Sequence, residues 1–141
     1  MTRPLNLDRF VEAQEKVYAA ALQEVKNGIK TSHWMWFIFP QISGLGRSDI
    51  SKFYAIKDLE EAAQYLAHPL LGNRLIEISS QLLLLETNNA MEVFGSIDGQ
   101  KLQSCMTLFS VLEPTDPVFK NILQKFFNGK NDTNTLTLLY R

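Results

Sequence analysis

Chemically capable side chains are concentrated in residues 30–54, which read KTSHWMWFIFPQISGLGRSDISKFY. Aromatic rings alternate there with cationic side chains, an imidazole, an amide and several hydroxyls. This mixture is typical of the wall of a small-ligand pocket, in which apolar surface surrounds a few polar groups. We therefore predict that the segment supplies the ligand-binding residues Lys30, Trp34, Trp36, Gln41, Gly44, Gly46, Arg47, Ser48 and Tyr54.

The imidazole of His33 is the group in this segment best suited to exchange protons near neutral pH. An orienting carboxylate would complete an acid–base pair, and Asp98 is the candidate. Asp98, Lys101 and Ser104 recur every three residues, which places them on one face of a helix. We predict His33, Asp98 and Lys101 as catalytic residues and Ser104 as a ligand contact. The alternatives are a structural histidine and a weak surface ion pair on a capped helix.

Gly44 and Gly46 precede Arg47 and a sequence typical of a helix start at Ser48-Asp49. Glycines ahead of a helix N-terminus can present N–H groups to an anion, and the Arg47 guanidinium adds a forked donor. The spacing matches neither the Walker nor the dinucleotide-binding fingerprint. The pattern predicts an anion-receiving loop over residues 41–48, with an ordinary two-glycine turn as the alternative.

The aromatic residues of 34–39 allow two other interpretations. Tryptophan and phenylalanine are commonly buried, so the segment could be an aromatic wedge of the core with polar edges. If the rings are instead exposed, they would form a hot spot for a partner, and the domain would be a non-catalytic protein-interaction module. Burial distinguishes the interpretations, because rings around a hollow favour a ligand and a flat exposed patch favours a partner.

Composition argues against several classes of function. The two histidines have no metal-ligand spacing with each other or with the single cysteine, Cys105, so we predict no metal site and no cofactor. A formal net charge of -1 argues against a nucleic-acid partner. The longest nearly apolar run, 34–39, is too short to cross a bilayer, and the N-terminal residues do not resemble a signal peptide. We therefore predict a cytoplasmic protein that does not bind membranes.

The candidate site residues must be positioned by helices, because apolar residues recur along the chain at helical spacing. No stretch alternates between apolar and polar residues clearly enough to require a strand. The pattern predicts an all-α fold, in which residues 1–141 form a compact single-domain multi-helix bundle. We expect five main helices and two or three short ones. The first helix should run from Asn6 or Asp8 to about Asn27, with Gly28 following its end.

The strongest helix should begin at Pro69, because apolar residues then step by four and three along one stripe. This stripe consists of Leu71, Leu75, Ile78, Leu82 and Leu85. Other starts are predicted at Ser32, Ser48, Asp58, Asp98, Asp116-Pro117 and Asp132, where a capping residue precedes an apolar pattern.

Several runs resemble a bacterial and fungal family of small uncharacterised domains, some of whose members carry the mistaken label calpastatin. These runs are SHWMWFIFPQ, GLGRS, YAI, HPLLGNRL and DGQKLQSCMTLF. The resemblance spans nearly the whole chain and departs from the family at Cys105, where a serine is usual. It implies an all-helical fold and no established activity. Because some relatives are fused to ADP-ribose-binding macro domains, it also implies a nucleotide or ADP-ribose-like ligand.

These observations lead to an expected small-ligand-binding domain or hydrolase that acts on a nucleotide or ADP-ribose-like metabolite through region 30–54. Lys30 and Arg47 would meet phosphate, and Trp34 or Trp36 would stack on a base. His33 would be the acid–base group or a ligand donor. The sequence leaves open whether the protein is an enzyme or the interaction module described above.

Overall fold

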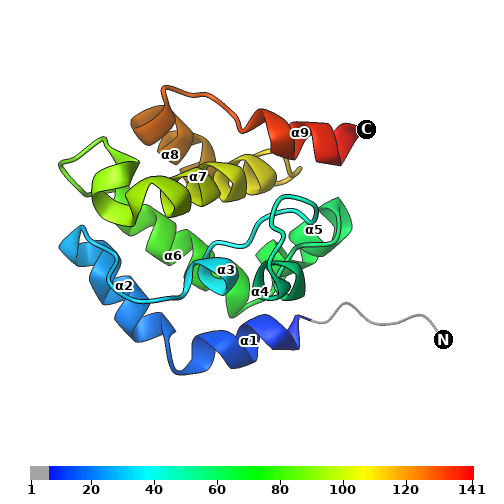
Figure 1. Ribbon diagram of the computed structural model, residues 1–141, viewed down its shortest axis with the longest axis horizontal. Helices are drawn as coiled ribbons and strands as arrows, with labels where there is room; N and C mark the ends of the chain where they lie inside the picture. The colour runs from blue at the N-terminus through cyan, green and yellow to red at the C-terminus, as the bar shows by residue number, and fades with distance from the viewer. Residues whose placement is uncertain (1–6) are drawn as a thin grey trace.

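The computed structural model describes residues 7–141, and the regular elements in that range are nine helices (Figure 1). In chain order they are α1 (Asp8–Glu15), α2 (Tyr18–Asn27), α3 (Met35–Ile38), α4 (Asp49–Phe53), α5 (Leu59–Ala67), α6 (Leu71–Leu83), α7 (Ala90–Ser110), α8 (Val118–Phe127) and α9 (Thr133–Tyr140). Within the same range, a parallel β-bridge joins Ile42 to Ile56. The prediction of an all-α fold is confirmed.

Helix α7 is the central element of the fold. It packs against α8, α9 and α5, while α6 packs against α8, α5 and α2. Figure 1 shows α7 crossing the middle of the molecule, with α8 and α9 above it and α1 to α4 below. The largest fully buried side chains between these layers are aromatic: Trp34, Tyr65, Phe10, Phe39, Phe109 and Phe119. One core therefore links the helices on both sides of α7.

The apolar stripe on α6 is confirmed over most of its length. Leu71, Leu75, Ile78 and Leu82 are at most 1% exposed. Leu85 is only half-buried, because α6 ends at Leu83 and the chain then turns away. The helix begins at Leu71 rather than at Pro69. The N–H groups of Leu70 and Leu71 donate hydrogen bonds to Nδ1 of the His68 ring just ahead of this start.

The first predicted helix is interrupted. Helix α1 ends at Glu15 and α2 begins at Tyr18, because α1 packs against α3 whereas α2 packs against α6. Packing against different partners requires a change of direction that one straight helix cannot provide. Asp8 is the first helical residue rather than the cap, and Asn6 lies outside the described residues. Gly28 follows α2 in the left-handed conformation (φ 80°), as predicted.

Two predicted helix starts are wrong. Asp98 lies inside α7, which begins at Ala90 after an Asn89 cap and continues across a kink at Gly95. Ser32 does not cap α3, because its hydroxyl and N–H donate to Glu24. Capping by the side chains of Ser48, Asp58 and Asp132 is confirmed. Asp116 likewise accepts a hydrogen bond from the N–H of Val118, the first residue of α8.

No helix in residues 7–141 has the length and apolar character needed to cross a membrane.

Candidate functional site

A polar cavity of about 400 Å³ lies between α7, the start of α9 and the loop of residues 41–46. Its walls carry four carboxamides, one ammonium group, one carboxylate, one hydroxyl and two aliphatic side chains. The lining residues are Gln41, Leu45, Gly46, Ile97, Gln100, Lys101, Gln103, Ser104, Asp132 and Asn134. The structure thus brings together Gln41, Gly46, Lys101 and Ser104 from the predicted set, which lie far apart in sequence.

The loop wall of the cavity is fixed at its base. Ile56 N–H donates to the Gln41 carbonyl over 2.8 Å, and Ser43 N–H donates to the Ile56 carbonyl over 2.8 Å. Gly46 packs so closely against α4 that a Cβ atom there would lie 2.4 Å from the Ser51 Cβ. Because real Cβ atoms do not approach so closely, any side chain at position 46 would push the loop away from α4.

Asp132, the residue before α9, holds the α9 side of the cavity against α7 through hydrogen bonds. Its Oδ2 accepts hydrogen bonds from Thr135 N–H (3.1 Å), Thr135 Oγ1 (2.5 Å) and Ser104 Oγ (3.0 Å). Its own N–H donates to Thr107 Oγ1 over 2.8 Å. These bonds cap α9 and hold its first turn against α7, so this side of the cavity is preorganised.

Asp98 joins two lysines behind the cavity. Its Oδ2 lies 2.9 Å from Lys30 Nζ, and its Oδ1 lies 3.6 Å from Lys101 Nζ. Each ammonium group also faces an indole ring: Lys30 lies 5.1 Å from the Trp34 centroid and Lys101 lies 5.3 Å from that of Trp36. Such cation–π contacts stabilise a partly desolvated ammonium group. Lys101 is the member of this cluster that lines the cavity.

Glu24 organises the segment that supports this cluster. Its carboxylate accepts hydrogen bonds from Thr31 N–H (2.6 Å), Ser32 N–H (3.0 Å), Ser32 Oγ and Trp34 Nε1 (3.0 Å). Partial burial raises the Glu24 pKa, but the donated hydrogen bonds outweigh it and lower the pKa to about 2. Glu24 therefore remains ionised and holds residues 31–34 against α2.

We expect Glu24→Gln to lower the free energy of unfolding by about 1–2 kcal/mol at pH 7, because a neutral amide replaces a charged acceptor. Because the Glu24 pKa is lowered in the folded protein, the stability that its carboxylate contributes should decrease as the pH falls. The carboxylate contribution should be complete above the ordinary pKa of 4.5 and should disappear as the pH falls toward 2. Urea unfolding of both proteins between pH 7 and pH 2.5 measures this, and a difference in stability that stays constant over the range would contradict it.

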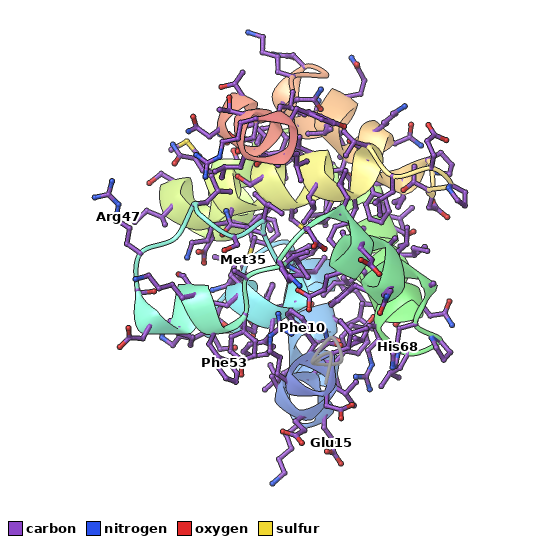
Figure 2. The ribbon with its side chains drawn as sticks, turned by 90° about the vertical axis from the view of Figure 1, so that its right-hand side faces the viewer. Phe10, Glu15, Met35, Arg47, Phe53 and His68 are labelled. Carbon is purple, nitrogen blue, oxygen red and sulfur yellow. The ribbon has the colours of Figure 1, made fainter. Side chains whose placement is uncertain are left out.

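His33 and Arg47 are among the predicted residues that do not line the cavity. His33 is exposed, does not line the cavity, and forms no side-chain hydrogen bond or ion pair with another described residue. The structure therefore does not bring it to Asp98 as an acid–base pair. Arg47 is also exposed, and Figure 2 shows its side chain extending outward from the loop.

Trp34 has no exposed surface, so it cannot stack on a ligand and instead supports the site from within the core. Trp36 and Tyr54 are half-buried and line a space of about 10 Å³ beneath the loop, which is too small for a metabolite. Gly44 (φ 107°) faces Leu138 of α9 and contributes to the contact between loop and helix. Ser48 caps α4 through its hydroxyl. Anion binding by residues 41–48 stays a prediction.

The residues that the sequence reasoning missed are the cavity's other polar groups, Gln100, Gln103, Asp132 and Asn134, and its apolar walls, Leu45 and Ile97. A signal existed for part of this set. Positions 97, 100, 101 and 104 share one face of a helix, so the polar face identified from Asp98, Lys101 and Ser104 extends naturally to Ile97 and Gln100. No local pattern indicated that the start of α9 would face them.

A second cavity, of about 480 Å³, lies between α5, α6 and the connection from α7 to α8. Ala63, Leu66, Ile76 and Leu112 make its wall largely apolar. Of its polar groups, the Asp116 carboxylate already accepts from Val118 N–H over 2.8 Å. A further hollow, of about 540 Å³, is lined in part by Lys120, Gln124 and Asn131, but none of its described lining residues belongs to the site predicted from the sequence. The first cavity is the better candidate because it combines a cation and several hydrogen-bonding groups with four of the predicted residues. Residues 7–141 contain no group of three or more His, Cys, Asp or Glu side chains arranged to hold a metal ion.

Comparison with known proteins identifies relatives whose function is also not established. The family model described as protein of unknown function (DUF1810) matches residues 4–139. A crystal structure of a conserved hypothetical protein from Mycobacterium tuberculosis is 41% identical in sequence, with a TM-score of 0.94 over 99% of each chain. No curated protein shows a significant match. The chain therefore belongs to the DUF1810 family of proteins of unknown function.

Proposed function

We propose that the protein is a small-molecule-binding domain whose ligand, a nucleotide-derived metabolite, occupies the polar cavity between α7, α9 and loop 41–46. The observation that carries the proposal is that Lys101 and four carboxamide residues line one hollow of about 400 Å³; of the four, Gln103 also donates from Nε2 to the Lys130 carbonyl. Small-ligand sites have volumes of about 300–1,000 Å³ and a few convergent polar groups, so size and chemistry agree.

The lining groups suit the parts of such a ligand. Carboxamides carry a donor and an acceptor side by side, the arrangement that pairs with the edge of a nucleobase. Leu45 and Ile97 add apolar surface that could cover the face of a base. The Lys101 ammonium group provides the charge for an anionic group of the ligand.

Binding is supported better than hydrolysis. The predicted acid–base group, His33, is exposed and lies outside the cavity lining. Asp98 is paired with both Lys30 and Lys101, so it positions these two ammonium groups rather than a reacting atom. Ser104 Oγ is within hydrogen-bonding distance of the Gln100 carbonyl and Asp132 Oδ2, an oxygen that also caps α9 through Thr135. No imidazole among residues 7–141 lines the cavity to activate this hydroxyl.

The interaction-module alternative receives less support, because its exposed aromatic patch is absent from residues 34–39. Trp34, Phe37 and Phe39 are buried, and Trp36 is half-buried beneath the loop. The segment is therefore mostly core, as one of the alternative interpretations expected.

Replacing Lys101 by methionine tests the proposal. We expect nucleoside monophosphates from a nucleotide panel to raise the Tm of the unaltered protein, and Lys101→Met to weaken binding of the best one at least about tenfold, since a charged hydrogen bond is lost. Lys26→Met is the matched control, because Lys26 is exposed on α2 and does not line the cavity. Equal binding by all three proteins, or no Tm increase with any compound, would contradict the proposal.

A further inference from the structure

The Asp132 carboxylate is only partly used by the fold. Three hydrogen bonds from Thr135 and Ser104 converge on Oδ2. The other oxygen, Oδ1, accepts no hydrogen bond from any described residue, although Asp132 lines the polar cavity. A carboxylate oxygen can accept hydrogen bonds, so Oδ1 retains the capacity to accept one from a hydroxyl or amine group in the cavity.

The charge of the cavity limits how much negative charge a ligand can carry. Among the described residues of its lining, Lys101 is the cation and Asp132 the anion, so their formal charges cancel. Lys101 is already shared with Asp98, 3.6 Å away. The remaining candidate cations are committed elsewhere: Lys30 is paired with Asp98 over 2.9 Å, and Arg47 extends into solvent (Figure 2).

Resting on the proposed function, we infer that the cavity selects a hydroxyl-rich, nucleoside-type ligand with no more than one anionic group. Asp132 Oδ1 accepts from the sugar hydroxyls, the carboxamides pair with the base, and Lys101 receives the single anionic group. A carboxylate that binds the two hydroxyls of a ribose is an arrangement that dinucleotide-binding proteins also use.

A pyrophosphate would fit this environment poorly. Its second phosphate would have no cationic partner in the cavity lining and would face the field of Asp132 or Asp98. Like charges in a partly desolvated site repel, and an unpaired buried charge loses its hydration. The expected order of affinity is therefore nucleoside or nucleoside monophosphate first, with the diphosphate and ADP-ribose weaker.

The test is an isothermal titration series on the full chain. Adenosine, guanosine, cytidine and uridine are compared first. For the best base, the series then includes the 5′-monophosphate, the 5′-diphosphate and the 2′,3′-dideoxynucleoside, with ADP-ribose as a further probe. We expect the dideoxynucleoside to bind about tenfold more weakly than the nucleoside, because it cannot donate to Asp132. The diphosphate should bind about tenfold more weakly than the monophosphate.

Asp132→Asn provides a variant on the protein side. Asparagine is also a good helix cap, so α9 should stay in place, which the Tm of the variant checks. The affinity difference between nucleoside and dideoxynucleoside should shrink, and the penalty on the second phosphate should fall. If the variant does not fold, the ligand series on the unaltered protein still decides.

The outcomes separate this inference from the proposed function. A diphosphate or ADP-ribose that binds more tightly than the monophosphate and loses affinity in Lys101→Met would overturn the inference and leave the proposed function standing. Equal affinity for nucleoside and dideoxynucleoside would also overturn it. If no compound in the series binds, the proposed function fails and the inference fails with it.

Discussion

Leu82→Ala is expected to lower the free energy of unfolding by about 2–5 kcal/mol, because it removes a fully enclosed side chain and leaves a cavity in the core. Leu82 has no exposed surface and lies on the buried apolar stripe of α6. The surrounding helices pack against α6 from several directions, which limits how far the site can collapse.

Leu84→Ala is the matched control for this substitution. Leu84 lies two residues further along the chain and is 75% exposed, so the same chemical change should alter stability by less than about 0.5 kcal/mol. Urea unfolding of the three proteins gives the comparison, provided that the m-values agree. A loss below about 0.5 kcal/mol for Leu82→Ala would show that this residue is not core.

Gly72→Ala is expected to destabilise the protein by about 1–3 kcal/mol, even though alanine favours helices. Gly72 lies in the first turn of α6, and a Cβ atom there would come within 1.9 Å of the Leu66 carbonyl oxygen of α5. The Leu66 oxygen belongs to the backbone, and a Cβ atom is attached rigidly to the backbone of its own residue, so the two helices must separate to admit a methyl group.

Gly99→Ala tests the steric origin of that effect. Gly99 is helical and buried in α7, but its added Cβ would have Ala90 Cβ as its nearest contact, at an ordinary 3.6 Å. We expect this substitution to be neutral or to stabilise the protein by up to about 1 kcal/mol through helix propensity. Similar unfolding free energies for the two alanine variants would contradict the steric explanation.

Much of the helical architecture could be predicted because its signals are local. Capping by Ser48, Asp58 and Asp132, the turn at Gly28 and the α6 stripe depend on residues within one or two helical turns. The division of the first helix could not be predicted in this way, because it depends on which distant helix each half packs against.

The candidate site was only partly predictable for the same reason. Gln41, Gly46, Lys101 and Ser104 belong to the right elements, and their polar character indicated a possible ligand wall. Asp132 and Asn134 join them because α9 folds back against α7, a contact with no local sequence signature. Exposure of His33 and enclosure of Trp34 likewise follow from the way Glu24 holds residues 31–34.

Amide chemical-shift mapping of the full chain tests most directly whether the polar cavity is a ligand site. The protein would be titrated with the nucleoside monophosphate that produces the largest increase in Tm. The proposed site predicts that the largest shifts fall in three separate segments that line it, 41–46, 97–104 and 132–135. Shifts centred on Ala63, Leu66 and Leu112 would place the ligand in the apolar cavity. Shifts centred on His33 would place the ligand at the exposed start of the segment 30–54, outside the polar cavity. Either result, or the absence of shifts in all three segments, would contradict the assignment of this cavity as the functional site.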